Sequence, residues 1–231
     1  MTKSPAVRRI ETVRILFCLL LASGLHSQIL DLSKLELKGV SAEFVTYHGS
    51  KAVKLIEKSI GQGDSLAIVK DLSFRDGTIE LEVAGSPATG VGEGARGFIG
   101  VAFRVQPNAS RFECIYVRPT NGRADDQLRR NHSTQYVSFP DWPWEKLRKE
   151  APGVYESYVD LQPGEWTKVR IAVKDVNASL FVGDAAQPCL LIHDLKLGAI
   201  GGGIALWIGP GTEGYFRNLH ITGHVTSAQG N

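Results

Sequence analysis

Residues 97–105 read GFIGVAFRV, and this stretch decides the fold class. Successive side chains of a β-strand point to opposite faces of its sheet. One face of this stretch is consistently apolar and consists of Ile99, Val101, Phe103 and Val105. The other face is small, ends in a cation and consists of Phe98, Gly100, Ala102 and Arg104. The alternation predicts a strand with its apolar face on a core, and a second face that is either a binding surface or an ordinary solvated one.

The same pattern continues on both sides of this strand. Short alternating runs are separated by turn dipeptides, among them Asp76-Gly77 and Asn121-Gly122. Such spacing is typical of a β-sandwich or barrel and not of βαβ units. The strands predicted in this way cover residues 42–47, 52–56, 65–69, 78–84, 98–105, 111–118, 135–138, 167–174, 178–182, 190–193, 203–208 and 215–222.

Four of these segments, taken in order, resemble the concanavalin A-like lectin/glucanase superfamily. They are FRDGTIELEV at residues 74–83, GFIGVAFR at 97–104, GEWTKVRIAV at 164–173 and GYFRNLHI at 214–221. Within that superfamily they are most similar to the laminin-G-like and 3-keto-disaccharide hydrolase-type domains related to family 16 glycoside hydrolases. The resemblance spans residues 40–223 and implies an all-β jelly-roll sandwich of two antiparallel sheets, with sugar on the concave sheet or its rim loops.

The family 16 catalytic pattern is not present. That mechanism needs alternating carboxylates on one strand, written Glu-x-Asp-x-x-Glu. Glu80 and Glu82 share a strand face here, but no aspartate stands between them and no third acid follows. The sequence therefore excludes this mechanism, and function cannot be carried over from the fold alone.

The amino-terminal residues indicate export. Lys3, Arg8, Arg9 and Arg14 precede the apolar run 15–22, and small residues follow at Gly24 and Ser27. This arrangement is typical of a secretory signal peptide at residues 1–27, with cleavage after Ser27 or Gly24. The run is shorter than the roughly 20 residues of a membrane span. We therefore expect a secreted or periplasmic protein with no membrane span after cleavage, and one domain over residues 28–231.

The charge of that domain excludes one class of partner. Residues 1–27 carry four basic residues and one acidic residue, so their removal changes the formal charge from +2 to −1. A nearly neutral domain gives no whole-domain attraction to nucleic acid. Cys114 and Cys189 remain, and the sequence leaves open whether they form a disulfide or stay as buried thiols.

Residues 112–158 form the most polar and most aromatic part of the chain. A long insert in a compact domain is commonly functional. Asp141 and Pro143 predict the start of one short helix that Pro152 and Gly153 end. Trp and Tyr faces stack on sugar C–H surfaces, while Arg, Asn and Gln bind hydroxyls. The side chains that we expect to contact a carbohydrate are Arg104, Tyr116, Arg118, Asn121, Arg130, Asn131, Gln135, Tyr136, Trp142 and Trp144.

Two other functions are open alternatives. In a glycoside-processing enzyme acting on a 3-keto sugar, Glu113 would be the base and His132 the proton donor, with Arg104 or Arg118 stabilising the enolate. Alternation places Glu113 on the apolar side, however, where it would be a buried structural acid. The second alternative is a laminin-G-like protein-interaction module. Neither a metal nor a cofactor is expected. His220 and His224 are four residues apart but lie at a strand end and tail and not on a helix, and the glycine-rich segment 201–214 lacks a P-loop lysine.

Overall fold

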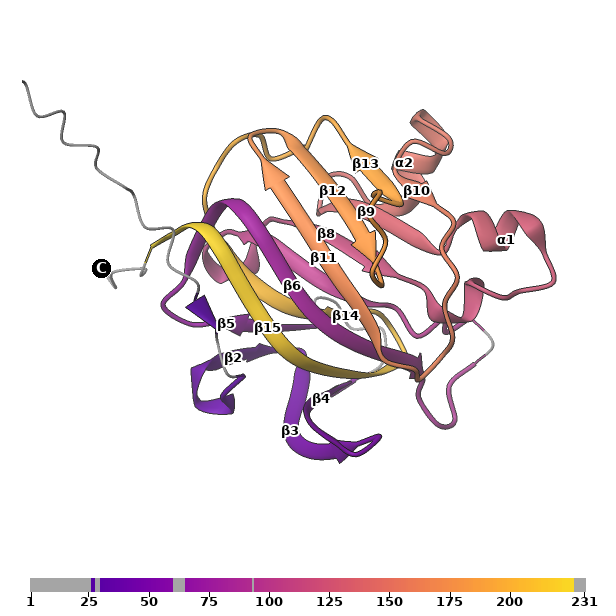
Figure 1. The fold of residues 1–231 in the computed structure, drawn as a ribbon, viewed down its shortest axis with the longest axis horizontal. Helices are drawn as coiled ribbons and strands as arrows, with labels where there is room; N and C mark the ends of the chain where they lie inside the picture. The colour runs from indigo at the N-terminus through magenta and orange to yellow at the C-terminus, as the bar shows by residue number, and fades with distance from the viewer. Residues whose placement is uncertain (1–25, 28–29, 60–64, 93, 227–231) are drawn as a thin grey trace, which may run out of the picture.

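The stretch at residues 97–105 forms β7 (Ile99–Val105), a central strand of one of two antiparallel sheets (Figure 1). The structure is a computed structural model, described for residues 26–27, 30–59, 65–92 and 94–226. We call the sheet that contains β7 sheet B. Its strands, in spatial order, are β10 (Glu156–Ser157), β9 (Thr134–Phe139), β8 (Phe112–Val117), β7, β14 (Gly203–Ile208), β5 (Leu66–Val69) and β2 (Leu35–Lys38).

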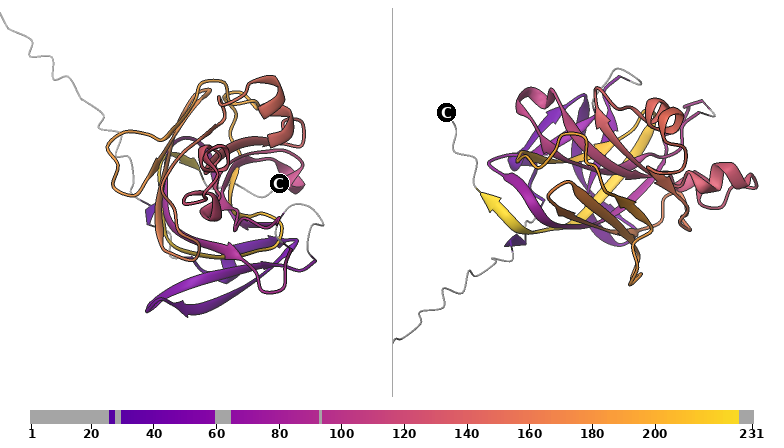
Figure 2. Two further views of the ribbon diagram at one scale, coloured as in Figure 1. Left: turned by 90° about the vertical axis from the view of Figure 1, so that its right-hand side faces the viewer. Right: turned by 90° about the horizontal axis from the view of Figure 1, so that it is seen from above.

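Sheet A faces sheet B across the interior (Figure 2). Its order is β13 (Leu190–Ile192), β12 (Asn177–Val182), β11 (Thr167–Lys174), β6 (Ser73–Pro87), β15 (Thr212–Thr226), β4 (Ser50–Glu57) and β3 (Val40–Tyr47), with β1 (His26–Ser27) also paired to β15. The helical segments are α1 (Gln127–Asn131), α2 (Trp144–Glu150) and the 3₁₀ turns Leu32–Lys34, Pro107–Ala109 and Pro119–Asn121. The predicted all-β sandwich of two antiparallel sheets is confirmed.

All twelve predicted strands are present, because alternation of apolar side chains is the signal that a sheet packed on one core requires. The strands that the sequence did not predict are β1, β2 and β10. β1 and β10 have two residues each, and the LELK sequence of β2 is too short and too polar to show a period. Within the described residues, no helix is long and apolar enough to cross a membrane.

The core lies between the sheets, as the apolar face of β7 predicts. Ile99, Val101 and Phe103 are fully buried and oppose core residues of β6 and β15 such as Ile79 and Phe216. Burial of this apolar surface is the main favourable term in the free energy of folding. The second face of β7 is also buried, so it is not the open small-residue surface that the sequence suggested. Gly100 on that face lies so close to β8 that a Cβ would stand 2.3 Å from the carbonyl oxygen of Ile115.

Arg104 corrects the face assigned from simple alternation. Its φ of 52° and the register shift between β7 and β14 mark a β-bulge at Arg104, which changes the direction of its side chain. The guanidinium is fully buried and donates to the carbonyl oxygens of Arg75, Asp175 and Gly198, with the Asp175 bond at 2.6 Å. Arg104 therefore binds sheet A and the β13–β14 connection, and does not project beside Tyr116 and Arg118.

The insert at residues 112–158 contains two α-helices and not one. Figure 1 shows α1 and α2 on the same side of the molecule as β9 and β10. Asp126 caps α1 by accepting a hydrogen bond of 2.6 Å from the Arg129 N–H. α2 begins after Pro143, whose side chain makes no capping bond, so the predicted cap by Asp141 is wrong. Pro143 is the N-cap residue, with an extended ψ of 164°.

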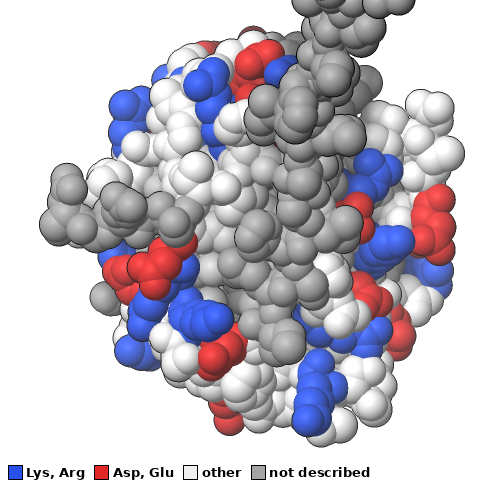
Figure 3. All heavy atoms as spheres, turned by 60° about the vertical axis from the view of Figure 1, so that its left-hand side comes forward, with Lys and Arg blue, Asp and Glu red and all other residues white. Residues whose placement is uncertain are grey.

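The amino-terminal prediction falls almost entirely on residues 1–25, which lie outside the described residues. His26 and Ser27 pair with Ile221 and His220 of β15, so cleavage after Gly24 would retain β1 and cleavage after Ser27 would remove it. The signal peptide and the extent of the domain stay predictions. On the face shown in Figure 3, the described basic and acidic side chains are interspersed, and neither sign forms a continuous field.

Candidate functional site

Several of the predicted residues meet at the end of β8, β9 and β10, on the face of sheet B that points away from sheet A. We call this group the Arg118 cluster, and it consists of Tyr116, Arg118, His132, Gln135, Trp144, Arg148 and Glu156. The register places Tyr116 opposite Gln135 and places Gln135 opposite Glu156. Three adjacent strands thus each supply one side chain to the same face.

Arg118 organises the floor of the cluster. It directly follows β8, and its Nη2 donates to the Tyr116 hydroxyl at 3.1 Å and to Gln135 Oε1 at 3.0 Å. Gln135 in turn donates to the backbone carbonyl oxygens of Tyr136 and Tyr155. All three side chains of the floor are buried. A buried network in which each group has partners is rigid, so the floor is preorganised.

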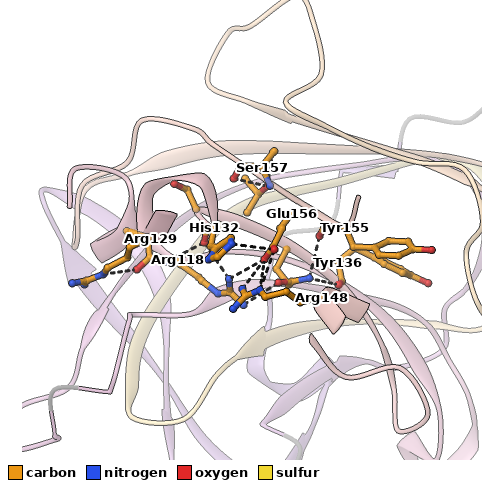
Figure 4. A network of polar contacts seen from close by, with 12 residues as sticks. Arg118, Arg129, His132, Tyr136, Arg148, Tyr155, Glu156 and Ser157 are labelled. Carbon is orange, nitrogen blue, oxygen red and sulfur yellow. Dashed lines mark hydrogen bonds and ion pairs between the residues drawn. The ribbon is translucent and has the colours of Figure 1, made fainter. Parts of the chain in front are cut away.

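Glu156 lies at the centre of the cluster, with Arg118, Arg148 and His132 directed towards it (Figure 4). Arg148 from α2 donates through Nη2 at 2.6 Å and through Nε at 3.0 Å. His132, which follows α1, places Nε2 3.1 Å from Glu156 Oε1, and Arg118 Nη1 lies 3.9 Å from Oε2. Two guanidinium groups therefore share one buried carboxylate. Bidentate arginine–carboxylate pairs fix orientation as well as charge.

Trp144 forms the solvent-facing edge of the cluster. Its ring centroid lies 4.6 Å from the Cζ of Arg148 and 5.8 Å from that of Arg118, and the residue is 37% exposed. Cation–π contacts of this kind hold an indole in place while leaving part of its surface open. Arg148 and His132 are also partly exposed beside it. The cluster thus presents an aromatic surface, a guanidinium and an imidazole to a ligand.

Protonation states follow from burial. Burial lowers the pKa of His132, and the nearby Arg148 and Arg118 lower it further, while Glu156 opposes them. His132 is therefore neutral at pH 7, with its Nε2 3.1 Å from Glu156 Oε1 and its Nδ1 on the other side of the ring. Burial also raises the pKa of Tyr116 to about 12, against the opposing charge of Arg118. The Tyr116 hydroxyl consequently remains protonated and is a hydrogen-bonding group and not a base.

Three predicted residues belong to the loop that supports the cluster. The Asn121 side chain is buried, donates to the carbonyl oxygen of His132 at 3.0 Å and accepts from Arg129 Nε at 3.0 Å. Arg130 donates to the Tyr158 hydroxyl, and the exposed Asn131 accepts from Gln127. Asn121 therefore positions His132. Direct sugar contacts by Arg130 or Asn131 stay predictions.

Trp142 and Trp144 contact different parts of the protein, although only one residue separates them in the sequence. The centroid of the Trp142 ring lies 3.7 Å from Lys146 Nζ and 4.6 Å from Lys196 Nζ. Its backbone pairs with Ser138 of β9. Trp142 thus fastens the start of α2 to sheet B, while Trp144 faces the Arg118 cluster.

Glu113 and Tyr136 lie on the opposite face of sheet B, inside the sandwich. The Tyr136 hydroxyl donates to Glu113 Oε2 at 2.6 Å, and the backbone N–H of Leu197 donates to Oε1 at 2.7 Å. Both residues are fully buried, and burial raises the pKa of Glu113 even though these hydrogen bonds oppose the shift. Glu113 and His132 therefore do not face one substrate. The predicted placement of Glu113 and Tyr136 at a sugar site is corrected by the register, which assigns them to the core.

Sequence reasoning missed Arg148 and Glu156, the most tightly bound pair of the cluster. A signal for Arg148 was available, because residues four apart lie on one face of a helix and Trp144 was already selected. Glu156 gave no comparable signal, since β10 has only two residues. Among the described residues, no group of three or more histidine, cysteine, aspartate and glutamate side chains could hold a metal ion.

Comparisons with known proteins confirm the fold. No family model matches the sequence, and none of the curated proteins compared with it does. The carbohydrate-binding module CBM66 from Bacillus subtilis is 14% identical with a TM-score of 0.52, and the match covers 80% of this chain and 95% of that chain. A putative glycosyl hydrolase from Parabacteroides distasonis is 12% identical with a TM-score of 0.52, over 86% and 98% of the two chains.

The exoplasmic/lumenal domain of VIP36, in its Ca²⁺/Man3GlcNAc-bound form, is 10% identical with a TM-score of 0.50, over 90% of this chain and 89% of that chain. Identities this low establish a shared architecture and no more. The likenesses agree with the jelly-roll sandwich implied by the sequence resemblance. The finer resemblance to laminin-G-like and 3-keto-disaccharide hydrolase-type domains stays a prediction.

Proposed function

We propose that this chain is a carbohydrate-binding domain and that the Arg118 cluster is its sugar site. The observation that carries the proposal is the partly exposed Trp144 ring beside Arg148 and His132, above a floor of buried, mutually bonded side chains. An apolar surface with a few fixed polar groups is the common composition of small-molecule sites. Such a surface suits a sugar ring, which has an apolar C–H face and a rim of hydroxyls.

The role of each side chain in the cluster follows from the surface or the polar atoms that it has available for a ligand. Trp144 would stack on the sugar, while Arg148 would donate to a pair of hydroxyls. Neutral His132 would accept a hydrogen bond from a sugar hydroxyl through Nδ1, because its Nε2 is directed to Glu156. Glu156, Arg118 and Gln135 would act by positioning these groups, since they are buried. The site would therefore need little rearrangement on binding, which lowers the entropic cost of association.

The similar structures are consistent with this proposal. One is described as a carbohydrate-binding module, one as a putative glycosyl hydrolase and one as bound to Man3GlcNAc. We favour binding over glycoside processing because an acid and a base must both reach one substrate. Glu113 lies between the two sheets, whereas His132 lies beside Glu156 in the Arg118 cluster on the other side of sheet B. We also propose that the domain acts outside the cytoplasm, on the basis of the charged and apolar pattern of residues 1–27.

A glycan array compared across variants tests the proposal. We expect the wild-type protein to bind at least one glycan, and Trp144→Ala and Arg148→Ala to weaken that binding by about tenfold or more, since loss of a stacking or bidentate contact costs on the order of 1–2 kcal/mol. Leu128→Ala and Arg123→Ala are matched controls, because both residues are exposed and lie outside the cluster. Folded protein that binds no glycan, or equal binding by all variants, would refute the proposal.

A further inference from the structure

A separate cavity of about 630 Å³ opens on sheet A. It lies where β3 and β4 diverge from β15, and the Arg118 cluster belongs to the other sheet. Its lining consists of Leu30, Phe44, Val45, Thr46, Lys51, Ala52, Val53, Phe216, Arg217, Asn218 and His220. The volume is in the range of pockets that hold small organic molecules, which is roughly 300–1,000 Å³.

The cavity results from an interruption in strand pairing. The ladder between β15 and β4 ends at Phe216 and Val53, and the ladder between β15 and β1 involves only His220 and Ile221. In the described part of the chain, residues 217–219 pair with neither neighbour on that side. Asn218 has a φ of 54° at a register shift between β15 and β6, so a bulge bends β15 there. The opening is therefore built into the backbone and does not depend on one rotamer.

The lining of the cavity is largely apolar, and the exposed ring of Phe44 lies at its mouth. Val45, Ala52, Val53 and Phe216 contribute to the lining, but Ala52, Val53 and Phe216 are buried, so the apolar surface open to a ligand comes mainly from Val45 and Phe44. Phe44 is 56% exposed, and its ring stacks on no other described aromatic side chain. An apolar ligand body that covered this ring would gain free energy from its burial.

The charge around the cavity is one-sided. The described lining contains the cations Lys51 and Arg217 and has no acidic residue. Arg217 is already committed, since it donates through Nε and Nη2 to Glu82 at 2.9 Å and lies over the Trp166 ring. Lys51 is exposed and forms no ion pair with a described residue. Lys51 is therefore the cation available to a ligand.

We propose that this cavity binds an amphipathic anion, meaning a ligand with an aliphatic or aromatic body and one carboxylate or sulfonate group. The body would cover Phe44 and the partly exposed Val45, and the anionic group would meet Lys51. A saccharide fits this lining less well, because it needs several hydrogen-bonding groups. Asn218 donates to Glu82 and Arg217 is bound to the same carboxylate, so two of the polar groups at the cavity are already used. This site is independent of the proposed sugar site.

Fluorescence titration with 8-anilinonaphthalene-1-sulfonate, which has an aromatic body and a sulfonate, tests the inference. Phe44→Ala removes the exposed ring and Lys51→Gln removes the charge, and neither side chain is buried. Leu191→Ala, 48% exposed on β13, and Lys58→Gln, exposed just after β4, are the matched controls on the same sheet. Circular dichroism confirms that every variant is folded, so that the signal reports the native cavity.

We expect one saturable site per chain, displacement by dodecanoate, and dissociation constants raised about fivefold or more by Phe44→Ala and Lys51→Gln, because each removes one of the two principal contacts. The controls should stay within about twofold of the wild type, as expected for surface substitutions away from a contact. The inference is overturned if binding is not saturable, or if all variants bind equally. Displacement by a neutral oligosaccharide but not by dodecanoate would assign the cavity to sugars instead. A Trp144→Ala protein that loses glycan binding and retains dodecanoate binding would separate the two sites.

Discussion

Glu113 and Glu156 are buried glutamates on opposite faces of one sheet, and their partners give them different roles. Glu113 accepts from the Tyr136 hydroxyl and the Leu197 N–H between the two sheets. Glu156 accepts from Arg148 and lies beside His132 at the edge of the sandwich. A buried carboxylate must be paired or hydrogen-bonded, because its desolvation is costly. Glu113 therefore stabilises the core, and Glu156 positions the groups that would contact sugar.

Removal of the Glu113 carboxylate should affect stability and not binding. Glu113→Ala leaves the Tyr136 hydroxyl and the Leu197 N–H without an acceptor in the core, so we expect a loss of about 2–4 kcal/mol in the free energy of unfolding. Urea denaturation measures this loss, with the exposed Glu145→Ala as a control that should change little. If Glu113→Ala abolished glycan binding while the free energy of unfolding stayed at the wild-type value, the role assigned to Glu113 would be wrong.

The His132 imidazole should make stability depend on pH. Burial lowers its pKa in the folded protein, whereas the unfolded value is about 6.5. Its neutral form therefore favours folding fully above about pH 6.5, and this contribution is lost as the pH falls through the folded pKa. In urea denaturation between pH 8 and pH 5, the wild type should lose more stability than His132→Gln. Equal losses in the two proteins would show that His132 is not the group concerned.

The residue scale also shows what sequence can and cannot predict about the site. Tyr116, Arg118, Gln135, Trp144 and His132 were selected for their chemistry, and the structure brings them together. Arg104 was selected from strand alternation, which fails where a residue adopts a positive φ. A bulge depends on how two distant strands pair, and that pairing is not encoded in the local pattern.

At the scale of elements, two short helices complete the Arg118 cluster. α2 supplies Trp144 and Arg148, and His132 follows the end of α1. Neither helix would be stable alone, because helices this short do not repay the cost of nucleation. Both depend on local bonds to the sheet, such as the Asp126 cap of α1 and the Asn121 bond to the carbonyl oxygen of His132. The site is therefore sensitive to substitutions that do not touch a ligand.

Asp126→Ala tests this dependence. Loss of the cap should cost about 1 kcal/mol and should weaken glycan binding, because α1 positions His132. The neighbouring Asp125→Ala is the matched control, since Asp125 is exposed and does not cap α1. Thermal unfolding measures the first effect and titration with an array-selected glycan measures the second. Identical behaviour of the two variants would contradict the role given to α1.

The sequence predicts a strand or helix well when its apolar residues form a recognisable pattern over several residues. The strands at residues 167–174 and 203–208 have the predicted bounds, because the first alternates between apolar and polar residues and the second is a short, continuous apolar run. α1 was missed because its five residues span little more than one turn and bury no side chain. β10 exists through its pairing with β9, and two residues cannot show a period. These elements are defined by tertiary contacts, which no local pattern contains.

At the scale of the whole molecule, the packing of the two sheets stabilises the fold, and no disulfide joins the cysteines of the described residues. Cys114 and Cys189 are both free thiols. Cys114 is fully buried in β8, and burial raises its pKa well above the usual value. Burial raises the pKa of Cys189 to about 11. Thiols held in the neutral form react slowly, so they remain reduced even where disulfides can form.

We therefore expect two titratable thiols per folding domain when the non-reduced protein is unfolded in denaturant. The melting temperature should not change when reductant is added, because there is no bridge to break. Peptide mass mapping of the same non-reduced sample gives an independent readout. A peptide pair that joins Cys114 to Cys189, together with a lower melting temperature in reductant, would contradict the free-thiol state.

The central claim is that the Arg118 cluster binds carbohydrate, and a crystal soaked with mixed oligosaccharides tests it most directly. We predict a sugar ring stacked on Trp144, with hydroxyls within hydrogen-bond distance of Arg148 and His132 and with Glu156 in its present place. A sugar bound only at another surface, with the Arg118 cluster free of ligand in the same crystal, would contradict the account.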